Sequence, residues 1–388
     1  MIILHVITGL NRGGAELMLQ RLIRHHRHQP ELRHHVVSLT AVGPIGSALA
    51  AEGVPVSALG MRGPLHLPSA VRRLTNEIRR LQPDVVQCWM YHADLAGGIA
   101  ARRAGCRNIL WGVRVADIFP AMGVPRTTLI VRRLCALLSR RIPSRILYVA
   151  ESARLVHERL GYDSSKSLVI HNGYEFLSRE QAEAFRVARR QELGLSDDAI
   201  LIGSAGRFSP QKGFFGFVEA AAAVAAHRPD AQFLLVGREV EWTNEALAQR
   251  VRDSGLAARF HLLGERSDLA EWLSAMDLFV LNSLGEGFPN VVAEAMSVGV
   301  PCLVTDVGDS ALLVGETGTV IKPRDQVALT RAMQAMALEP LASRRALGER
   351  ARLRVEQNFS MPVIARRFEQ LYKGLVQASA RPARVVEM

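Results

Sequence analysis

Short apolar segments rich in β-branched residues alternate with longer amphipathic segments along this chain, and the alternation runs through the sequence twice. Such alternation predicts buried parallel strands joined by helices that cover both faces of a sheet, in right-handed βαβ units. In the first half, strands are predicted at residues 2–7, 35–39, 54–59, 84–88, 108–113, 145–149 and 167–170, and helices at 15–28, 69–81, 92–104, 127–141 and 151–160.

The same pattern resumes after a polar segment at residues 178–190, which we predict to be a connector. Strands are predicted at residues 200–204, 232–236, 259–263, 277–282, 301–305 and 319–321, and helices at 341–358 and 362–377 close the chain. We therefore predict an α/β fold with two Rossmann-like, doubly wound parallel-sheet domains, residues 1–177 and 178–360, that face each other across a ligand-binding cleft. A length of 388 residues agrees with two domains, because one hydrophobic core seldom serves so long a chain.

Composition argues against several other classes of protein. The sequence contains no run of 18 apolar residues, so no membrane-spanning helix is predicted. The apolar start of the chain lacks the basic region of a signal peptide. The four cysteines form no C-x-x-C pair, which argues against a structural zinc site and a disulfide scaffold. We expect a reducing, cytoplasmic location, with any membrane contact being peripheral.

The net charge of +11 is unevenly distributed along the chain. Residues 1–180 carry 24 Lys and Arg against 12 Asp and Glu, whereas the remaining residues carry 24 against 25. This asymmetry indicates a polyanionic partner for the first half, either nucleic acid or an anionic membrane surface, although a general preference for arginine would also account for it. Few aromatic residues are interleaved with the basic ones, so we expect no nucleic-acid partner.

Two glycine-bearing turns between a strand and a helix are candidates for phosphate binding. The first contains Gly13 and Gly14, and such a turn lets backbone N–H groups approach an anion at a helix N-terminus. It lacks the G-x-G-x-x-G spacing, so it is equally explained as a structural βα turn. The second turn, residues 206–213, carries Arg207 and Lys212, two cations that are suited to clamp a diphosphate.

A pair of carboxylates follows the predicted strand at residues 277–282. Glu286 lies between glycines in a loop, and Pro289 suits the first position of a helix in which Glu294 lies about one turn along. Ionised carboxylates accept hydrogen bonds from adjacent hydroxyls, so the pair is suited to bind sugar and ribose while the helix N-terminus faces phosphates.

His92 follows the strand at residues 84–88 and begins a helix, which places it at the carboxyl edge of the predicted sheet. We interpret it as a site residue, against the simpler explanation of a capping or core histidine. Five further histidines show no spacing typical of metal ligands, and we interpret them as part of the basic surface: His25, His26, His28, His34 and His35.

Taken together, these motifs resemble the family-four retaining glycosyltransferases of GT-B architecture, and the resemblance covers nearly the whole chain. Its most specific part runs from Glu286 to Gly308 and includes two glutamates separated by seven residues. Less specific parts are the first glycine turn, His92, the pair Asn172 and Gly173, and the loop at residues 206–213.

The resemblance implies a role for each matching residue. Arg207 and Lys212 would bind the donor diphosphate and stabilise the leaving group without a metal ion or other cofactor. Glu286 would contact the hydroxyls of the donor sugar, Glu294 would hold the ribose, and His92 would lie beside the transferred sugar. The remaining donor-binding residues would contact the phosphates, sugar or base: Gly13, Gly14, Gly264, Arg266, Phe288, Pro289, Asn290 and Val291.

The family further implies transfer with retention of anomeric configuration, without a protein nucleophile. We expect transfer of a hexose or N-acetylhexosamine from a UDP-linked donor to a lipid-linked or growing polysaccharide acceptor. Residues 361–388 are predicted to form a helix that returns to the first domain. An arginine-rich amphipathic helix around residues 127–141 either rests on anionic lipid or faces the core.

Three alternative functions share this architecture. The function of a sugar-nucleotide epimerase remains an alternative, whereas that of a dinucleotide-dependent oxidoreductase is disfavoured by the missing G-x-G-x-x-G. A noncatalytic protein that binds nucleotide sugars or glycans would have no need of the cationic clamp. The sequence also departs from the family at Tyr174 and Glu175, where an aspartate often follows the Asn-Gly pair.

Overall fold

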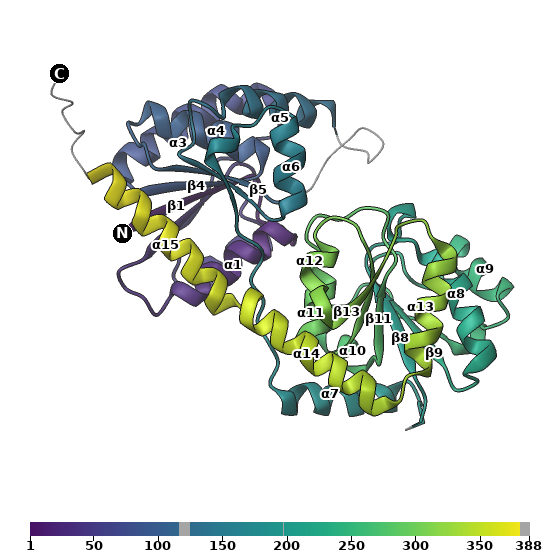
Figure 1. The fold of residues 1–388 in the computed structure, drawn as a ribbon. Helices are drawn as coiled ribbons and strands as arrows, with labels where there is room; N and C mark the ends of the chain where they lie inside the picture. The colour runs from purple at the N-terminus through teal and green to yellow at the C-terminus, as the bar shows by residue number, and fades with distance from the viewer. Residues whose placement is uncertain (116–124, 197, 381–388) are drawn as a thin grey trace, which may run out of the picture. The chain divides into compact units, whose positions relative to one another are not determined.

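The computed structural model describes residues 1–115, 125–196 and 198–380, and these form two compact units. The first unit consists of Met1–Gly173 and the segment that begins at Met361, and the second of Tyr174–Ser360. Each unit is an α/β structure around one parallel sheet (Figure 1), which confirms the predicted fold class of two doubly wound domains. Within the described residues, no helix has the length and apolar character needed to cross a membrane.

The first unit contains a seven-stranded sheet in the order β3-β2-β1-β4-β5-β6-β7, all of whose described pairings are parallel. Its strands are β1 (Ile2–Ile7), β2 (Arg33–Ser38), β3 (Val56–Ala58), β4 (Val85–Trp89), β5 (Ile109–Val113), β6 (Arg145–Tyr148) and β7 (Ser167–Val169). Its helices are α1 (Gly14–His26), α2 (Gly43–Ala51), α3 (Leu67–Leu81), α4 (Tyr91–Arg103), α5 (Arg126–Leu138), α6 (Glu151–Arg159) and α15 (Met361–Ala380).

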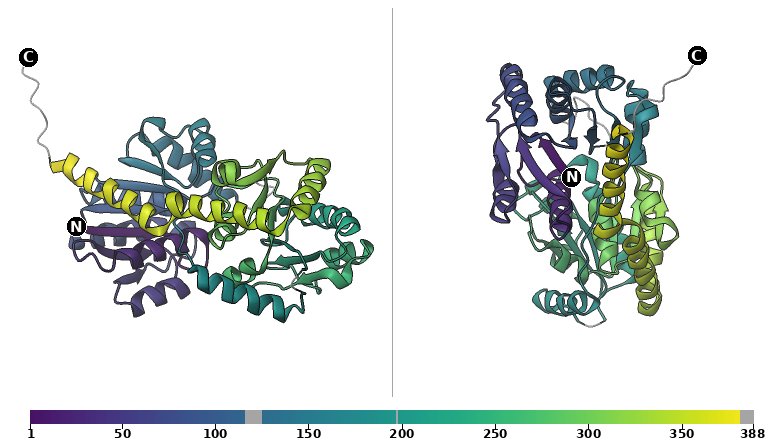
Figure 2. Two further views of the ribbon diagram at one scale, coloured as in Figure 1. Left: turned by 60° about the horizontal axis from the view of Figure 1, so that its bottom comes forward. Right: turned by 90° about the vertical axis from the view of Figure 1, so that its left-hand side faces the viewer.

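Helix α15 completes the core of the first unit although it is separated from the other elements by the whole second unit. Ile364, Phe368 and Tyr372 are fully buried against α1, α2 and the sheet, and Figure 2 shows the helix beside the strands. The ring of Phe368 stacks on that of Trp89 in β4, and the Tyr372 hydroxyl donates a hydrogen bond to the side chain of Gln87. The predicted terminal helix is thus present as far as residue 380, and residues 381–388 lie outside the described residues.

The second unit contains a six-stranded parallel sheet in the order β10-β9-β8-β11-β12-β13. Its strands are β8 (Leu201–Ala205), β9 (Gln232–Val236), β10 (Phe260–Leu262), β11 (Leu278–Leu281), β12 (Cys302–Thr305) and β13 (Gly318–Ile321). Its helices are α7 (Arg179–Glu192), α8 (Phe214–His227), α9 (Glu245–Asp253), α10 (Leu269–Ala275), α11 (Asn290–Ser297), α12 (Ser310–Val314), α13 (Gln326–Leu338) and α14 (Leu341–Phe359).

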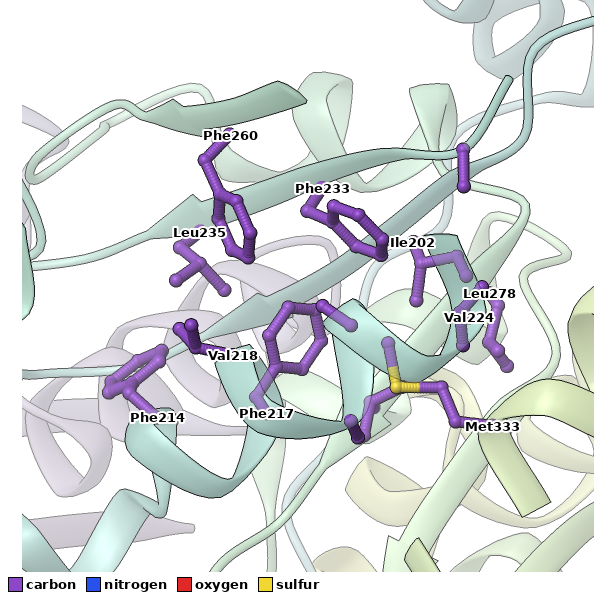
Figure 3. Close-up of a cluster of buried hydrophobic side chains, with 14 of the residues drawn as sticks. Ile202, Phe214, Phe217, Val218, Val224, Phe233, Leu235, Phe260, Leu278 and Met333 are labelled. Carbon is purple, nitrogen blue, oxygen red and sulfur yellow. The ribbon is translucent and has the colours of Figure 1, made fainter. Parts of the chain in front are cut away.

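One face of this second sheet packs against α8, α9 and α13. Phe217 and Val224 of α8 and Met333 of α13 meet Phe233 and Leu278 of the sheet (Figure 3). These side chains are almost completely buried, and burial of a large apolar side chain stabilises a fold by about 1.5–3 kcal/mol. The core therefore fixes the central strands whose carboxyl ends carry the candidate site.

The predicted connector at residues 178–190 is wrong, because this segment forms most of helix α7. Ser178 caps the helix by accepting a hydrogen bond from the backbone N–H of Gln181, and the Gln181 side chain accepts one from the N–H of Ser178. Arg186 and Arg190 then pair with the buried carboxylate of Asp277 at 2.5 and 3.0 Å. The polar composition of this segment therefore did not indicate a helix, because the helix is stabilised by its capping box and by buried ion pairs.

Candidate active site

The loops that follow β8 and β11 lie at the centre of the second sheet, where the strand order reverses. Residues 206–213 leave the carboxyl end of β8, and residues 282–289 leave the carboxyl end of β11, its neighbour in the sheet. Crevices at such switch points are where open α/β sheets bind their ligands. The structure therefore brings together the two loops in which the sequence predicted diphosphate-binding and sugar-binding residues.

Lys212 and Glu286 form an ion pair between these loops. The Lys212 Nζ lies 2.6 Å from Glu286 Oε1, and the Ser283 hydroxyl donates to the same oxygen at 2.6 Å. Glu286 Oε2 accepts no hydrogen bond from the described residues, so it is available to a hydroxyl of a ligand. Both side chains are mostly buried, with exposed fractions of 23% for Lys212 and 13% for Glu286, which strengthens their interaction.

Two glycines allow the loops to approach so closely. Gly213 has a φ of +66°, and a Cβ atom there would lie 2.0 Å from the carbonyl oxygen of Asn282. Gly308 has a φ of +58°, and its Cβ would lie 2.3 Å from the carbonyl oxygen of Gly287, which also accepts a hydrogen bond from Asp309 N–H at 2.9 Å. Only glycine fits either position, so backbone contacts hold the glutamate-bearing loop in place.

Arg207 is exposed at the mouth of the same loop. Within the described chain its guanidinium makes no hydrogen bond or ion pair, unlike the amine of Lys212. Gly206, the residue before it, has a φ of +156°, and a Cβ there would lie 3.2 Å from the Lys212 side chain. The loop thus offers one cation that is positioned by Glu286 and one that makes no ion pair within the described chain.

Phe288, Pro289 and Asn290 lead into helix α11, and an aromatic cluster holds them. The Phe288 ring lies 6.4 Å from that of Tyr174 and 5.3 Å from that of Phe359. The Tyr174 hydroxyl donates to Asn290 Oδ1 at 2.6 Å. Pro289 is the N-cap residue, so the predicted first helical position is wrong by one residue and the helix begins at Asn290.

The other two predicted residues of this helix are partly buried. Val291 lies in the first turn of α11, and Glu294 is its fifth residue, as the sequence predicted. The helix ends at Ser297, and Gly299 follows with a φ of +80°, which is the usual place of a glycine after a helix.

Gly264 and Arg266 follow β10, two strands away from β8 on the same edge of the sheet. Gly264 has a φ of +68°. Arg266 forms a two-pronged ion pair with Asp268 at 2.9 Å and lies over the ring of Trp272 at 5.5 Å. The carboxylate of Asp268 raises the pKa of Arg266. Asp268 and Trp272 therefore hold the guanidinium in place, and a guanidinium is suited to stacking on an aromatic base.

In the first unit, Gly13 and Gly14 lie at the N-terminus of α1, after the loop at residues 8–12 that follows β1. Gly13 is the N-cap residue, and a Cβ there would lie 2.4 Å from Glu16 Oε2, so the Glu16 side chain folds over it. Burial raises the pKa of Glu16. The glycine turn is thus shaped by a carboxylate of its own helix.

His92 lies at the start of α4, directly after β4, the neighbour of β1. Met90, the N-cap residue, has a φ of +74°, a strained conformation for a residue with a side chain. His92 is half-buried, and burial lowers the pKa of its imidazole, which favours the neutral form at pH 7. The glycine turn and His92 therefore occupy the switch point of the first sheet.

A largely apolar cavity of about 470 Å³ opens beside His92. Thr8, at the end of β1, and Arg62 line it together with Ile130 and Leu134 of α5. Ile130 and Leu134 are 57% and 41% exposed, and Leu137 is 75% exposed. Of the two interpretations of the helix at 127–141, the exposed amphipathic face therefore fits better than a helix facing the core.

The interpretation of the histidine cluster as a basic surface is wrong for His26 and His34. Both are buried, and with His5 they form a hydrogen-bonded row behind Trp89. His28 is exposed, as expected. The row lies in the core of the first unit, since α1 and β2 both pack there.

Ser283 and Tyr174 are two site residues that the sequence analysis missed. Ser283 shares the Glu286 carboxylate with Lys212, and its place directly after a buried strand was the available signal. Tyr174 was noted only as a departure from the family pattern, but it is 1% exposed and orients Asn290.

Comparison with known proteins gives two matches to family models. Residues 12–176 match the model described as Glycosyltransferase Family 4, and residues 199–338 match the model described as Glycosyl transferases group 1. The two models together span most of the chain.

Several curated proteins are similar to part of the chain. A lipopolysaccharide core biosynthesis mannosyltransferase of Rhizobium meliloti is 33% identical over 48% of this chain and 55% of its own length. A UDP-Gal:alpha-D-GlcNAc-diphosphoundecaprenol alpha-1,3-galactosyltransferase of Escherichia coli is 29% identical over 61% of each chain. The chain thus matches somewhat more than half the length of these relatives.

Solved structures match over nearly the whole chain. HepE of Anabaena in complex with UDP has a TM-score of 0.81 at 22% identity and covers 96% of this chain and 100% of its own. Sucrose-phosphate synthase of Thermosynechococcus elongatus has a TM-score of 0.75 at 19% identity and covers 97% and 100%. The fold is therefore GT-B, as the sequence predicted.

Proposed function

We propose a sugar-transfer reaction for this chain from one premise, that the chain belongs to the family-four glycosyltransferases. The reaction moves a hexose or N-acetylhexosamine from a UDP-linked sugar to a glycan acceptor. The observation that carries the proposal is the triplet Lys212, Ser283 and Glu286 at the switch point of the second sheet. The named relatives, which act in lipopolysaccharide and lipid-linked glycan synthesis, support the choice of acceptor class.

On the donor side, Lys212 and Arg207 would bind the diphosphate and stabilise the charge that develops as the glycosidic bond breaks. Lys212 is already positioned by Glu286, so little reorganisation is needed when the donor binds. Glu286 Oε2 would accept a hydrogen bond from a sugar hydroxyl, and Glu294 one from the ribose. A structure of HepE with UDP-glucose supports a uridine donor for this fold.

We further propose that transfer proceeds with retention and without a metal ion. The two cations supply the charge stabilisation that a divalent metal provides in other transferases. The acceptor hydroxyl would attack from the side of the departing diphosphate, which then takes up its proton. His92 would bind beside the transferred sugar in its neutral form.

On the acceptor side, we propose that the cavity beside His92 receives the acceptor. Its largely apolar lining and Arg62 suit an acceptor that joins a lipid to a phosphate-linked sugar.

The exposed Ile130, Leu134 and Leu137 of α5, together with the basic first half, suit a peripheral position on an anionic membrane. Sedimentation with anionic vesicles tests the membrane contact. We expect salt-sensitive binding that is lost in Leu137→Asp but kept in Val327→Asp. Binding that changes neither with salt nor in Leu137→Asp would contradict the membrane contact.

Donor turnover tests the site directly. We expect Lys212→Ala to lower kcat/KM about 100-fold in a panel of nucleotide sugars, because one preorganised charge contact to the leaving group is lost. Glu286→Gln should impair discrimination among sugars as well as rate. Lys322→Ala and Glu316→Gln, at exposed positions of the same unit, are the matched controls. Unchanged turnover in both site variants would refute the assignment.

A further inference from the structure

A second cavity lies in the second unit, between helices α7 and α14. Its volume is about 220 Å³, and it is bordered by Met276 and Asp277 before β11 and by Pro301 before β12. These residues precede their strands, so the cavity lies at the amino edge of the parallel sheet, whereas the donor loops leave the carboxyl edge. It is therefore a separate place from the proposed donor site.

Arginine dominates the lining of this cavity. Among the described residues, five arginines line it, against three carboxylates: Arg179, Arg186, Arg344, Arg345 and Arg352 against Glu183, Asp277 and Glu349. Two of the three carboxylates are already engaged, because Asp277 is paired with Arg186 and Arg190, and Glu349 with Arg179. Asp277 also accepts the backbone N–H of Leu201 at 2.8 Å. The lining therefore carries positive charge that its own carboxylates do not balance.

Arg344 and Arg352 carry this unbalanced charge in buried positions. They are 7% and 6% exposed. Within the described chain they bind only backbone carbonyls: Arg344 those of Ala337 and Glu339, and Arg352 that of Leu177 at 2.6 Å. The Nε atom of each is buried and has no hydrogen-bond partner there. Within the described chain neither guanidinium forms a direct ion pair with a carboxylate, and a buried charge is costly unless a counter-ion joins it.

Charges of both signs lie near Arg344. Burial lowers the pKa of Arg344, Asp277 and Asp230 raise it, and Arg228 and Arg186 lower it. Arg345, on the same helix, is exposed and lines the cavity as well. An anion placed here would meet charges from α14 on one side and from α7 on the other.

We propose that this cavity is a binding site for a phosphate group, free or attached to a small sugar, with Arg344, Arg345 and Arg352 as its cationic ligands. Planar guanidinium groups bind phosphate through two parallel hydrogen bonds, which makes arginine the suitable residue. The volume of about 220 Å³ leaves room for a phosphate with one attached sugar ring but not for a whole nucleotide sugar. A bound phosphate would link α7 to α14 and so stabilise the second unit.

Isothermal titration of the full chain with inorganic phosphate and, separately, with a hexose monophosphate tests the proposal, with sodium chloride at equal ionic strength as the reference. We expect saturable binding of at least one of them and a higher thermal midpoint. Tighter binding of the hexose monophosphate would identify an esterified ligand, and equal affinity would identify free phosphate.

Variants separate this site from the donor site. Arg345→Gln, at an exposed position, should weaken binding about tenfold, in line with the loss of one charge-assisted contact. Arg344→Gln should abolish binding. If the Arg344→Gln variant does not fold, Arg345→Glu takes its place in the test and should likewise lose binding. Arg331→Gln, an exposed arginine of α13, and Lys212→Ala, in the donor site, should both bind as the unchanged chain does. Absence of saturable binding, or binding lost in Lys212→Ala but kept in Arg345→Gln and Arg345→Glu, would overturn the proposal.

Discussion

The buried histidine row of the first unit should make that unit sensitive to mild acid. Trp89 Nε1 donates to His5 Nδ1 at 3.2 Å, His5 Nε2 lies 2.9 Å from His34 Nδ1, and His34 Nε2 lies 3.1 Å from His26 Nδ1. Since Trp89 can only donate, each neutral imidazole of the row accepts at Nδ1, and His5 and His34 donate at Nε2. A proton added to His34 or His26 would place two N–H groups against each other, so the folded row excludes it.

The loss of folding stability at acid pH depends on how many protons the unfolded chain takes up that the folded chain does not. Burial lowers the pKa of His26 from 6.5 to about 4 and that of His34 from 6.5 to about 3. The neighbouring His26 also contributes to the shift of His34. Between pH 7 and pH 5 the unfolded imidazoles take up protons while the folded ones do not. Stability is therefore present above pH 6.5 and is lost as the pH falls toward the folded pKa values. Each ring contributes a loss of about 2 kcal/mol over this interval, or about 4 kcal/mol for the two together.

Urea unfolding at pH 7 and pH 5, followed by circular dichroism and tryptophan fluorescence, measures this loss. His26→Asn should reduce the difference between the two pH values by about 2 kcal/mol, because one titrating ring is removed. His28→Asn is the matched control, since His28 is exposed two residues further along. A loss below about 1 kcal/mol in the unchanged chain, or an equal effect of both variants, would refute the reasoning.

Two further substitutions test the donor loops. Gly213→Ala should lower the thermal midpoint and donor affinity together, because its Cβ would lie 2.0 Å from the carbonyl oxygen of Asn282; a variant with unchanged midpoint would show that the loop has room to move. Tyr174→Phe removes the hydrogen bond to Asn290 and should cost about 1 kcal/mol in urea unfolding while raising the donor KM, and an unaltered KM would exclude Tyr174 from positioning the site.

The fold was predictable from the sequence because both sheets are parallel and buried on two faces. Their strands read as continuous apolar segments, and the observed bounds of β1 and β9 are those predicted. Helix α7 was missed because its stability depends on a capping box and on pairing with Asp277, which lies far away in the sequence. Apolar periodicity does not report either contribution.

The candidate site was predictable where chain position alone places a residue. Lys212 and Glu286 each follow a strand, so adjacent strands bring them together. The contributions of Ser283 and Tyr174 depend on side-chain directions that no spacing rule gives. The buried histidines were misread for a similar reason, since a polar ring enters a core only when tertiary neighbours satisfy it.

The composition of the first unit has a consequence for the order in which the molecule is made. Its core includes Ile364, Phe368 and Tyr372 of α15, which leave the ribosome after everything else in that core and after the whole of Tyr174–Ser360. Synthesis runs from the N-terminus, so the second unit is complete while the first still lacks a helix along one face of its sheet. During translation the order of maturation is therefore the reverse of the order in the gene: the half that is made first is finished last, and its apolar face stays exposed to chaperones until the final helix arrives.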